Sequence, residues 1–216
     1  MPAVALENCQ RRLEDGADTR MERSRVVELH YITPISNLPS IAERGILSNR
    51  RAHEVGHASI ADEAVQGIRE QKLVPGGRPL HEYANVYFDA RNPMMYRRLN
   101  HRLEVAVVRV DSAALEIPGT VVTDGNAASG ATSFLPSPGG LAQLDEERVY
   151  AQFWTDPDSW IYWEKKRQRC AEVLVPDQIP SDLIRGCYVV EESLLTVCRA
   201  TAPSLDVAVE RRVFFS

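Results

Sequence analysis

The sequence predicts an α+β protein in which a split β-sheet core is flanked by short helices. Many short apolar runs of strand length are separated by turn residues, and few segments show helical periodicity. These runs do not alternate with helices, so a sheet built from βαβ units is not expected. The length of 216 residues fits one domain. We therefore expect a single domain over 26–216, preceded by an N-terminal extension over 1–25 that is helical at 3–16.

The first expected elements are a strand, a short helix and a loop. The run VVELHYIT over 26–33 has the composition of a strand. Ser36 is placed to cap a helix over 37–44, and Gly45 follows where a helix commonly ends in glycine. Residues 48–58 are polar and lack periodicity, which predicts a loop.

The next elements are recognised by their starting residues. Ser59 and Asp62 form a capping box, which predicts a helix that continues to about Lys72. A short strand is expected over 84–88. Pro93 then favours the first turn of a helix, because proline lacks the N–H group that this turn leaves unpaired.

The second half of the chain is dominated by strands. Residues 104–110 form a clear apolar run, and 117–123 form another. The stretch 124–140 is rich in Gly, Ser, Ala and Pro, which predicts a long loop of the kind that is usually functional or mobile. Further along, we expect strands over 171–175 and 186–191, a helix over 192–200 and a last strand near 207–215.

Composition and charge exclude several classes of protein. The net charge is −5, so the chain as a whole is not a polycation for nucleic acid, although residues 91–103 are locally basic. No apolar run is long enough to cross a membrane. The four cysteines form no CxxC pair and have no zinc spacing. We expect a cytoplasmic protein with free thiols, no metal and no membrane contact.

The common nucleotide and hydrolase motifs are missing from the sequence. There is no GxxxxGK[ST], GxGxxG, GxSxG or HExxH. His53 and His57 have the i, i+4 spacing of a metal pair but lie in a segment that contains glycine, and we do not expect them to bind a metal. A Cys/His hydrolase stays possible in principle, but no one thiol is singled out.

Glu172 is the most informative single residue. It stands at the mouth of an apolar strand, three residues after Arg169, which ends the basic run over 165–169. Burying an unpaired carboxylate is costly, so Glu172 is either exposed at the strand end or held there for a task. The segment His30-Tyr31-Ile32-Thr33 offers a complementary wall, with rings for stacking and hydroxyl and imidazole groups for hydrogen bonds.

Six segments in fixed order resemble the DarT family of NAD-dependent ADP-ribosyltransferases, which are toxins that modify a base in single-stranded DNA. The resemblance covers roughly residues 26–190, and the block over 80–96 is its longest and most specific part. The segments are HYITPISNLPSIAERGILS (30–48), SIADEAVQGIR (59–69), VPGG (74–77), LHEYANVYFDARNPMMY (80–96), TDGNAAS (123–129) and AEVLVPDQIP (171–180).

This resemblance implies the ADP-ribosyltransferase split sheet, NAD as co-substrate in the cleft between two small sheets, and two catalytic residues. Glu172 matches the family's catalytic glutamate, which stabilises the positive charge that develops on the ribose. Arg69 matches the helix arginine that contacts NAD and helps to deprotonate the target base. The family often has two adjacent arginines there, whereas this chain has Ile68-Arg69. If the first of the two is the essential one, the assignment shifts by one residue.

The NAD-binding residues implied by the resemblance are His30, Tyr31, Ile32, Thr33, Ser40, Leu47 and Arg69. Many members read Tyr-His-Ile-Thr where this chain reads His30-Tyr31-Ile32-Thr33. Either Tyr31 replaces the family histidine, or His30 acts from a shifted register. The two options differ structurally, because a shift by one residue turns a strand side chain to the other face.

The DNA-binding residues that we expect are Arg169, Arg91, Asn126 and Trp154. Trp160 and Trp163 are further candidates for stacking on bases. The resemblance also implies a macrodomain-type antitoxin that removes ADP-ribose from DNA. Thymine is the first choice of base and guanine the second. Transfer to RNA or protein, and an inactive module that binds NAD or nucleic acid, stay open as alternatives.

Overall fold

The computed structural model describes residues 19–60 and 62–215. The helix expected over 3–16 lies outside the described residues. The described residues of the expected N-terminal extension, 19–25, contact the rest of the protein. Met21 is buried, and its backbone N–H donates to the carbonyl of Leu144.

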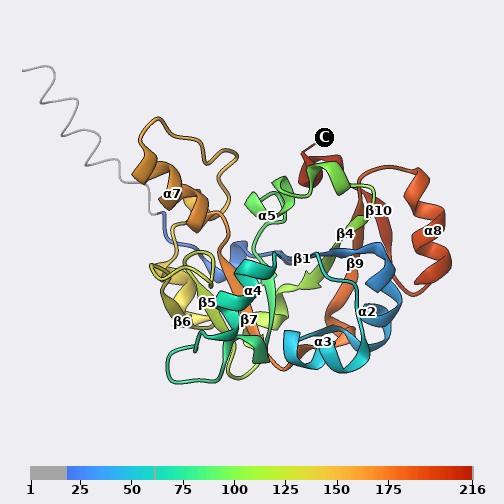
Figure 1. Cartoon of the computed structure of the whole chain (residues 1–216), viewed down its shortest axis with the longest axis horizontal. Helices are drawn as coiled ribbons and strands as arrows, with labels where there is room; N and C mark the ends of the chain where they lie inside the picture. The colour runs from blue at the N-terminus through green and yellow to red at the C-terminus, as the bar shows by residue number, and fades with distance from the viewer. Residues whose placement is uncertain (1–18, 61, 216) are drawn as a thin grey trace, which may run out of the picture.

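Within the described residues, the strands form an eight-stranded sheet and a two-stranded sheet (Figure 1). The strand order in the large sheet is β10-β9-β4-β1-β3-β7-β5-β6, and β2 pairs with β8. The strands are β1 (Glu28–Pro34), β2 (Ile46–Leu47), β3 (Tyr83–Tyr87), β4 (Val105–Asp111), β5 (Val121–Thr123), β6 (Phe134–Pro136), β7 (Glu172–Pro176), β8 (Gln178–Ile179), β9 (Ile184–Val189) and β10 (Val207–Val209).

The large sheet is split between β1 and β3. β1 pairs with β4 along its whole length, and β3 pairs with β7 through all five of its residues. Between β1 and β3, however, only His30 and Tyr87 are paired. Two half-sheets therefore meet at one point and diverge beyond it. The predicted α+β class with a split sheet and short flanking helices is confirmed.

The helices are short and lie around the sheet. In Figure 1, α7 and α8 lie at opposite ends of the molecule, and α4 lies near its centre. The helices of the described residues are α2 (Leu38–Arg44), α3 (Asn49–Val55), α4 (Glu63–Glu70), α5 (Pro93–Tyr96), α6 (Glu146–Val149), α7 (Ser159–Gln168) and α8 (Ser193–Thr201).

The main apolar core lies against the half-sheet strands and is continuous across the split. Leu29 of β1, Val86 of β3, Val108 of β4 and Val173 of β7 are fully buried in it. A second cluster, around Phe214, packs the chain end against α5. The core thus holds both half-sheets in place although they share a single backbone pair.

Three expected elements differ from the structure. Residues 48–58 were expected to be a loop, but they contain α3, because the Ser48 hydroxyl caps the N–H of Arg51. The helix buries none of its residues, so it has no apolar periodicity to detect. The last expected strand, 207–215, ends at Val209 and continues as a 3₁₀ helix. The expected loop 124–140 contains β6.

Gly45 gives a test of this packing. Its φ of 77° favours glycine, and a Cβ atom there would collide with the carbonyl oxygen of Ile179 in β8. We expect Gly45→Ala to lower the free energy of unfolding by about 3 kcal/mol, from backbone strain plus overpacking. Gly56 has a similar φ of 67° but open space around it. Gly56→Ala should cost only the strain, about 1 kcal/mol. Equal losses in urea unfolding would contradict the collision.

Candidate active site

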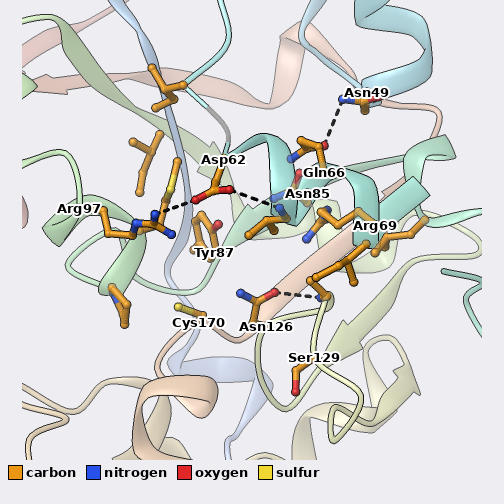
Figure 2. Close-up of a pocket in the computed structure, with 18 of the residues that line it drawn as sticks. Asn49, Asp62, Gln66, Arg69, Asn85, Tyr87, Arg97, Asn126, Ser129 and Cys170 are labelled. Carbon is orange, nitrogen blue, oxygen red and sulfur yellow. Dashed lines mark hydrogen bonds and ion pairs between the residues drawn. The ribbon is translucent and has the colours of Figure 1, made fainter. Parts of the chain in front are cut away.

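A cavity of about 610 Å³ lies at the split of the sheet (Figure 2). Its walls come from both half-sheets, since Tyr31 and Thr33 of β1 and Tyr87 of β3 line it. α4, α5, α7 and the loop around Asn126 supply the rest of the lining. This volume falls in the range of small-molecule and cofactor sites. The divergence of β1 from β3 therefore creates space for a ligand inside the sheet.

The alternation of β3 explains how the cavity wall is built. Tyr83, Asn85 and Tyr87 line the cavity, whereas Ala84 and Val86 between them are buried in the core. Neighbouring side chains of a strand point to opposite faces, so one strand serves both the cavity and the core. The sequence indicated Tyr87 as a pocket wall, but Tyr83 and Asn85 of the same face were not singled out. The alternation of Tyr and Asn with Ala and Val was the available signal.

Glu172, the first residue of β7, is 1% exposed and has its charge compensated. The Nη1 atom of Arg69 lies 3.2 Å from its Oε1 and 3.1 Å from its Oε2. The backbone N–H of Ala127 donates to Oε1 at 2.8 Å. The backbone N–H of Glu172 donates to the Thr123 hydroxyl at 2.9 Å, which fixes the start of the strand. A buried carboxylate with such donors is held in one position.

Arg69 reaches Glu172 from α4 and also lines the cavity. Asp62 caps this helix by accepting from the N–H groups of Ala64 and Val65. Of the two adjacent positions considered from the sequence, Ile68 is 53% exposed while Arg69 is buried. The helix thus turns Arg69, and not its neighbour, toward Glu172.

Two further groups beside Glu172 are neutral. Tyr87 is directly opposite Glu172 in the strand register. Burial and the charge of Glu172 raise the pKa of Tyr87 well above its usual value. Burial, and secondarily the same charge, raise the pKa of the Cys170 thiol to about 12. A thiol with so high a pKa is not a nucleophile at neutral pH, which argues against a cysteine hydrolase.

The structure distinguishes the two readings of the β1 segment. Tyr31, Ile32 and Thr33 line the cavity. The ring of His30 instead lies 3.2 Å from Glu28 and close to Tyr188. The hydrogen bond with His30 is the main cause that lowers the pKa of Glu28 to about 2. Tyr31 is therefore the residue that reaches the cavity, and His30 lies outside its lining.

The cavity is also lined by polar side chains around Gln66. Leu47 lines it, as expected, but Ser40 lies half-buried in α2 and outside the lining. Gln66 is the centre of this polar group, because its Oε1 lies 3.4 Å from Asn49 Nδ2 and 3.1 Å from His81 Nε2. Sequence reasoning missed these residues, since Asn49 lay in the segment read as a loop.

The four residues expected to bind DNA are not gathered at one place. Asn126 lines the cavity, but Trp154 packs against Tyr96 and Phe215, 5.9 Å from each ring centroid. Arg91 lies over the ring of Phe215 and donates to a backbone carbonyl.

Arg169 is a correction to the expected DNA contacts. Its guanidinium is buried and donates to the carbonyls of Val149 and Ala151 and to Asp89. The Arg169 guanidinium therefore binds groups inside the protein and is not placed to contact a phosphate. Sequence position three residues before Glu172 did not reveal that the side chain turns inward.

The described residues contain neither a metal-binding cluster nor a membrane-spanning helix. No group of three or more His, Cys, Asp and Glu residues in 19–60 and 62–215 is arranged to hold a metal ion. Among the same residues, no helix is both long and apolar enough to cross a membrane.

A split sheet whose cavity is lined by an arginine that pairs with a buried glutamate is the arrangement of an ADP-ribosyltransferase. The comparison with protein families gives the same class. A family model described as "ssDNA thymidine ADP-ribosyltransferase, DarT" matches residues 30–214. The chain belongs to the DarT family, an NAD-dependent family of DNA ADP-ribosyltransferases.

Curated relatives agree with this assignment. A "DNA ADP-ribosyl transferase-DNA ADP-ribosyl glycohydrolase fusion protein" of Thermosipho africanus is 33% identical over 175 residues, which cover 76% of this chain and 43% of the fusion protein. The chain thus spans less than half of that relative. A "DNA ADP-ribosyl transferase" of Thermus sp. strain 2.9 is 30% identical over 167 residues, covering 72% of this chain and 78% of the relative.

Solved structures share the fold. Thermosipho africanus DarTG in complex with ADP-ribose superimposes with a TM-score of 0.76 at 28% identity, over 88% of this chain and 51% of that one. Thermus sp. 2.9 DarT in complex with ADP-ribosylated ssDNA gives a TM-score of 0.72 at 23% identity, over 87% and 96%. The second likeness, at lower identity, supports the fold alone.

The Arg69 and Glu172 pair can be tested by stability. Arg69→Met leaves a buried carboxylate with one backbone donor, so the free energy of unfolding should fall by about 3 kcal/mol. The double variant Arg69→Met/Glu172→Leu removes both charges and should recover most of that loss in urea unfolding. A double variant that is less stable than Arg69→Met would show that the two residues are not paired as described.

Proposed function

We propose that this protein transfers ADP-ribose from NAD to a thymine base in single-stranded DNA and releases nicotinamide. The observation that carries the proposal is the carboxylate of Glu172, held by Arg69 and the Ala127 N–H at a cavity between the half-sheets. The family description supports DNA as the acceptor and thymine, rather than guanine, as the base.

The lining of the cavity suits NAD. Apolar and aromatic side chains make up much of the wall, with amide, hydroxyl and charged groups placed among them. We assign the nicotinamide end to Tyr31, Ile32 and Thr33, beside Glu172. The end around Leu47 and Gln66 then receives the adenosine half. The Thermosipho africanus relative, which shares 28% identity, was solved with ADP-ribose, the group that would be transferred.

In the proposed reaction, the bond between the nicotinamide nitrogen and C1′ of the ribose breaks, and its electron pair leaves with nicotinamide. Positive charge develops on the ribose, and the carboxylate of Glu172 stabilises it while accepting a hydrogen bond from a ribose hydroxyl. Both oxygens of Glu172 already have donors. The ribose hydroxyl must therefore replace one of them, or share an oxygen with it.

The acceptor side needs a ring nitrogen that has lost its proton. A guanidinium keeps its positive charge in proteins and is therefore not an efficient proton acceptor. We assign Arg69 an electrostatic role, because a positive charge beside the base lowers the pKa of its ring N–H. The deprotonated nitrogen then forms the new bond to C1′, and the proton passes to solvent.

The biological role follows from the chemistry. A thymine that carries ADP-ribose on its ring nitrogen cannot form its normal base pair, so we propose that this protein acts as the toxin of a toxin–antitoxin system in the cytoplasm. Its partner would be a macrodomain-type enzyme that removes ADP-ribose from DNA. The Thermosipho africanus fusion protein, whose name joins a transferase to a glycohydrolase, supports this pairing.

The proposal predicts a mass gain of one ADP-ribose when a single-stranded oligonucleotide is incubated with the protein and NAD. Fragmentation should place the gain on thymine. Glu172→Gln keeps the size and hydrogen-bonding capacity of the side chain but removes its charge, so the rate should fall at least about a hundredfold. A matched control, Glu43→Gln, changes an exposed glutamate outside the cavity lining and should modify DNA normally.

Three results would contradict the proposal. A gain on RNA or on protein, but not on DNA, would change the acceptor while leaving the role of Glu172. Full activity of Glu172→Gln would overturn the mechanism. No gain on any acceptor would favour a module that only binds NAD or nucleic acid.

A further inference from the structure

Two tryptophans on α7 are unusually exposed. Trp160 is 80% exposed and Trp163 is 61% exposed, although tryptophan is highly buried on average. They are three residues apart and so lie on one face of the helix. Both also line the cavity. An aromatic surface therefore continues from the cavity mouth to the outside of the molecule.

The basic end of α7 adds a cation to this surface. Lys165 pairs with Asp156, and Arg167 pairs with Asp124 and Glu164. Lys166 lines the cavity and has no carboxylate within ion-pair distance among the described residues. Its Nζ lies 4.6 Å from the centroid of the Trp163 ring. The surface thus combines two aromatic faces with a cation that is available to an anion.

α7 is attached to the catalytic side of the cavity. The carbonyl of Arg167 accepts from the N–H of Asn126, and its guanidinium donates to Asp124 and to the hydroxyl of Thr132. Gly125 passes so close to Arg167 that a Cβ atom would collide with it. The same loop supplies the Ala127 N–H to Glu172. A group bound on α7 is therefore held in a fixed relation to the reacting centre.

We propose that Trp160 and Trp163 are a stacking platform for the bases that neighbour the modified thymine, with Lys166 contacting the phosphate between them. This inference rests on the proposed function. Single-stranded nucleic acid is bound by aromatic rings that stack on bases and by cations that follow the backbone, which is the chemistry of this surface. Trp154 has no part in it, because its ring packs with Tyr96 and Phe215. Continuity with the cavity favours DNA over a protein partner.

The test measures binding of a fluorescent thymine-containing oligonucleotide to the Glu172→Gln protein by anisotropy, so that turnover is not needed. Trp160→Leu and Trp163→Leu should each raise the Kd for DNA about tenfold, the effect of losing one stacked base. Trp163→Phe should restore most of the affinity, because stacking needs only an aromatic face. Lys166→Gln should reduce the slope of log Kd against log salt by about 0.7, as expected for one lost phosphate contact on a single strand.

Phe153 provides the matched control. It is 73% exposed and precedes the same helix, but it does not line the cavity. Phe153→Leu should leave the Kd for DNA unchanged. Circular dichroism of each variant checks that α7 is still folded, and calorimetry with NAD checks the other substrate.

Five outcomes separate the possibilities. Unchanged DNA affinity in the two Trp→Leu variants overturns the platform, and so does an equal loss in Phe153→Leu. A loss of NAD affinity without loss of DNA affinity would place the tryptophans in the NAD site instead. Loss of antitoxin binding with DNA binding intact would identify a protein-docking surface. If the platform variants lose DNA binding but the unaltered protein modifies no DNA, the proposed function fails while the surface stands.

Discussion

The buried ion pair between Arg69 and Glu172 is the interaction on which the site depends. A carboxylate that is 1% exposed would be costly without a cation beside it, so α4 and β7 must approach each other at this point. The pair joins segments 103 residues apart in the sequence. Ala127 adds a donor from a third segment. Holding the charge of Glu172 therefore also fixes the positions of the helix, the strand and the loop that surround the cavity.

The split of the sheet supplies the space in which this charge can act. Because β1 and β3 share only the pair of His30 and Tyr87, the strands diverge and expose Tyr31 and Thr33 to the cavity. A fully paired sheet would have used those edges for hydrogen bonds and left no room for a ligand. The apolar core beneath both half-sheets offsets the missing backbone pairs. The fold therefore lacks sheet hydrogen bonds between β1 and β3 beyond this pair, and the cavity lies where they are missing.

The longer strands, and the strand and helix that carry Glu172 and Arg69, were predictable, because apolar runs and a resemblance of whole segments both depend on local sequence. What failed were properties set by tertiary contacts. In the sequence, Arg169 resembles a surface cation. Only the structure shows that its guanidinium donates to Val149, Ala151 and Asp89 in the interior. The choice between His30 and Tyr31 required the register of β1 against β3. α3 escaped prediction because an exposed polar helix lacks the apolar periodicity that reveals other helices.

The central claim is that the split of the sheet binds the nicotinamide end of NAD beside Glu172. A crystal structure of the Glu172→Gln protein with NAD tests this most directly. The account predicts the nicotinamide between β1 and β3, against Tyr31, with a ribose hydroxyl within hydrogen-bond distance of the side chain at 172. NAD bound with its nicotinamide at the Gln66 end, or outside the split, would contradict the account.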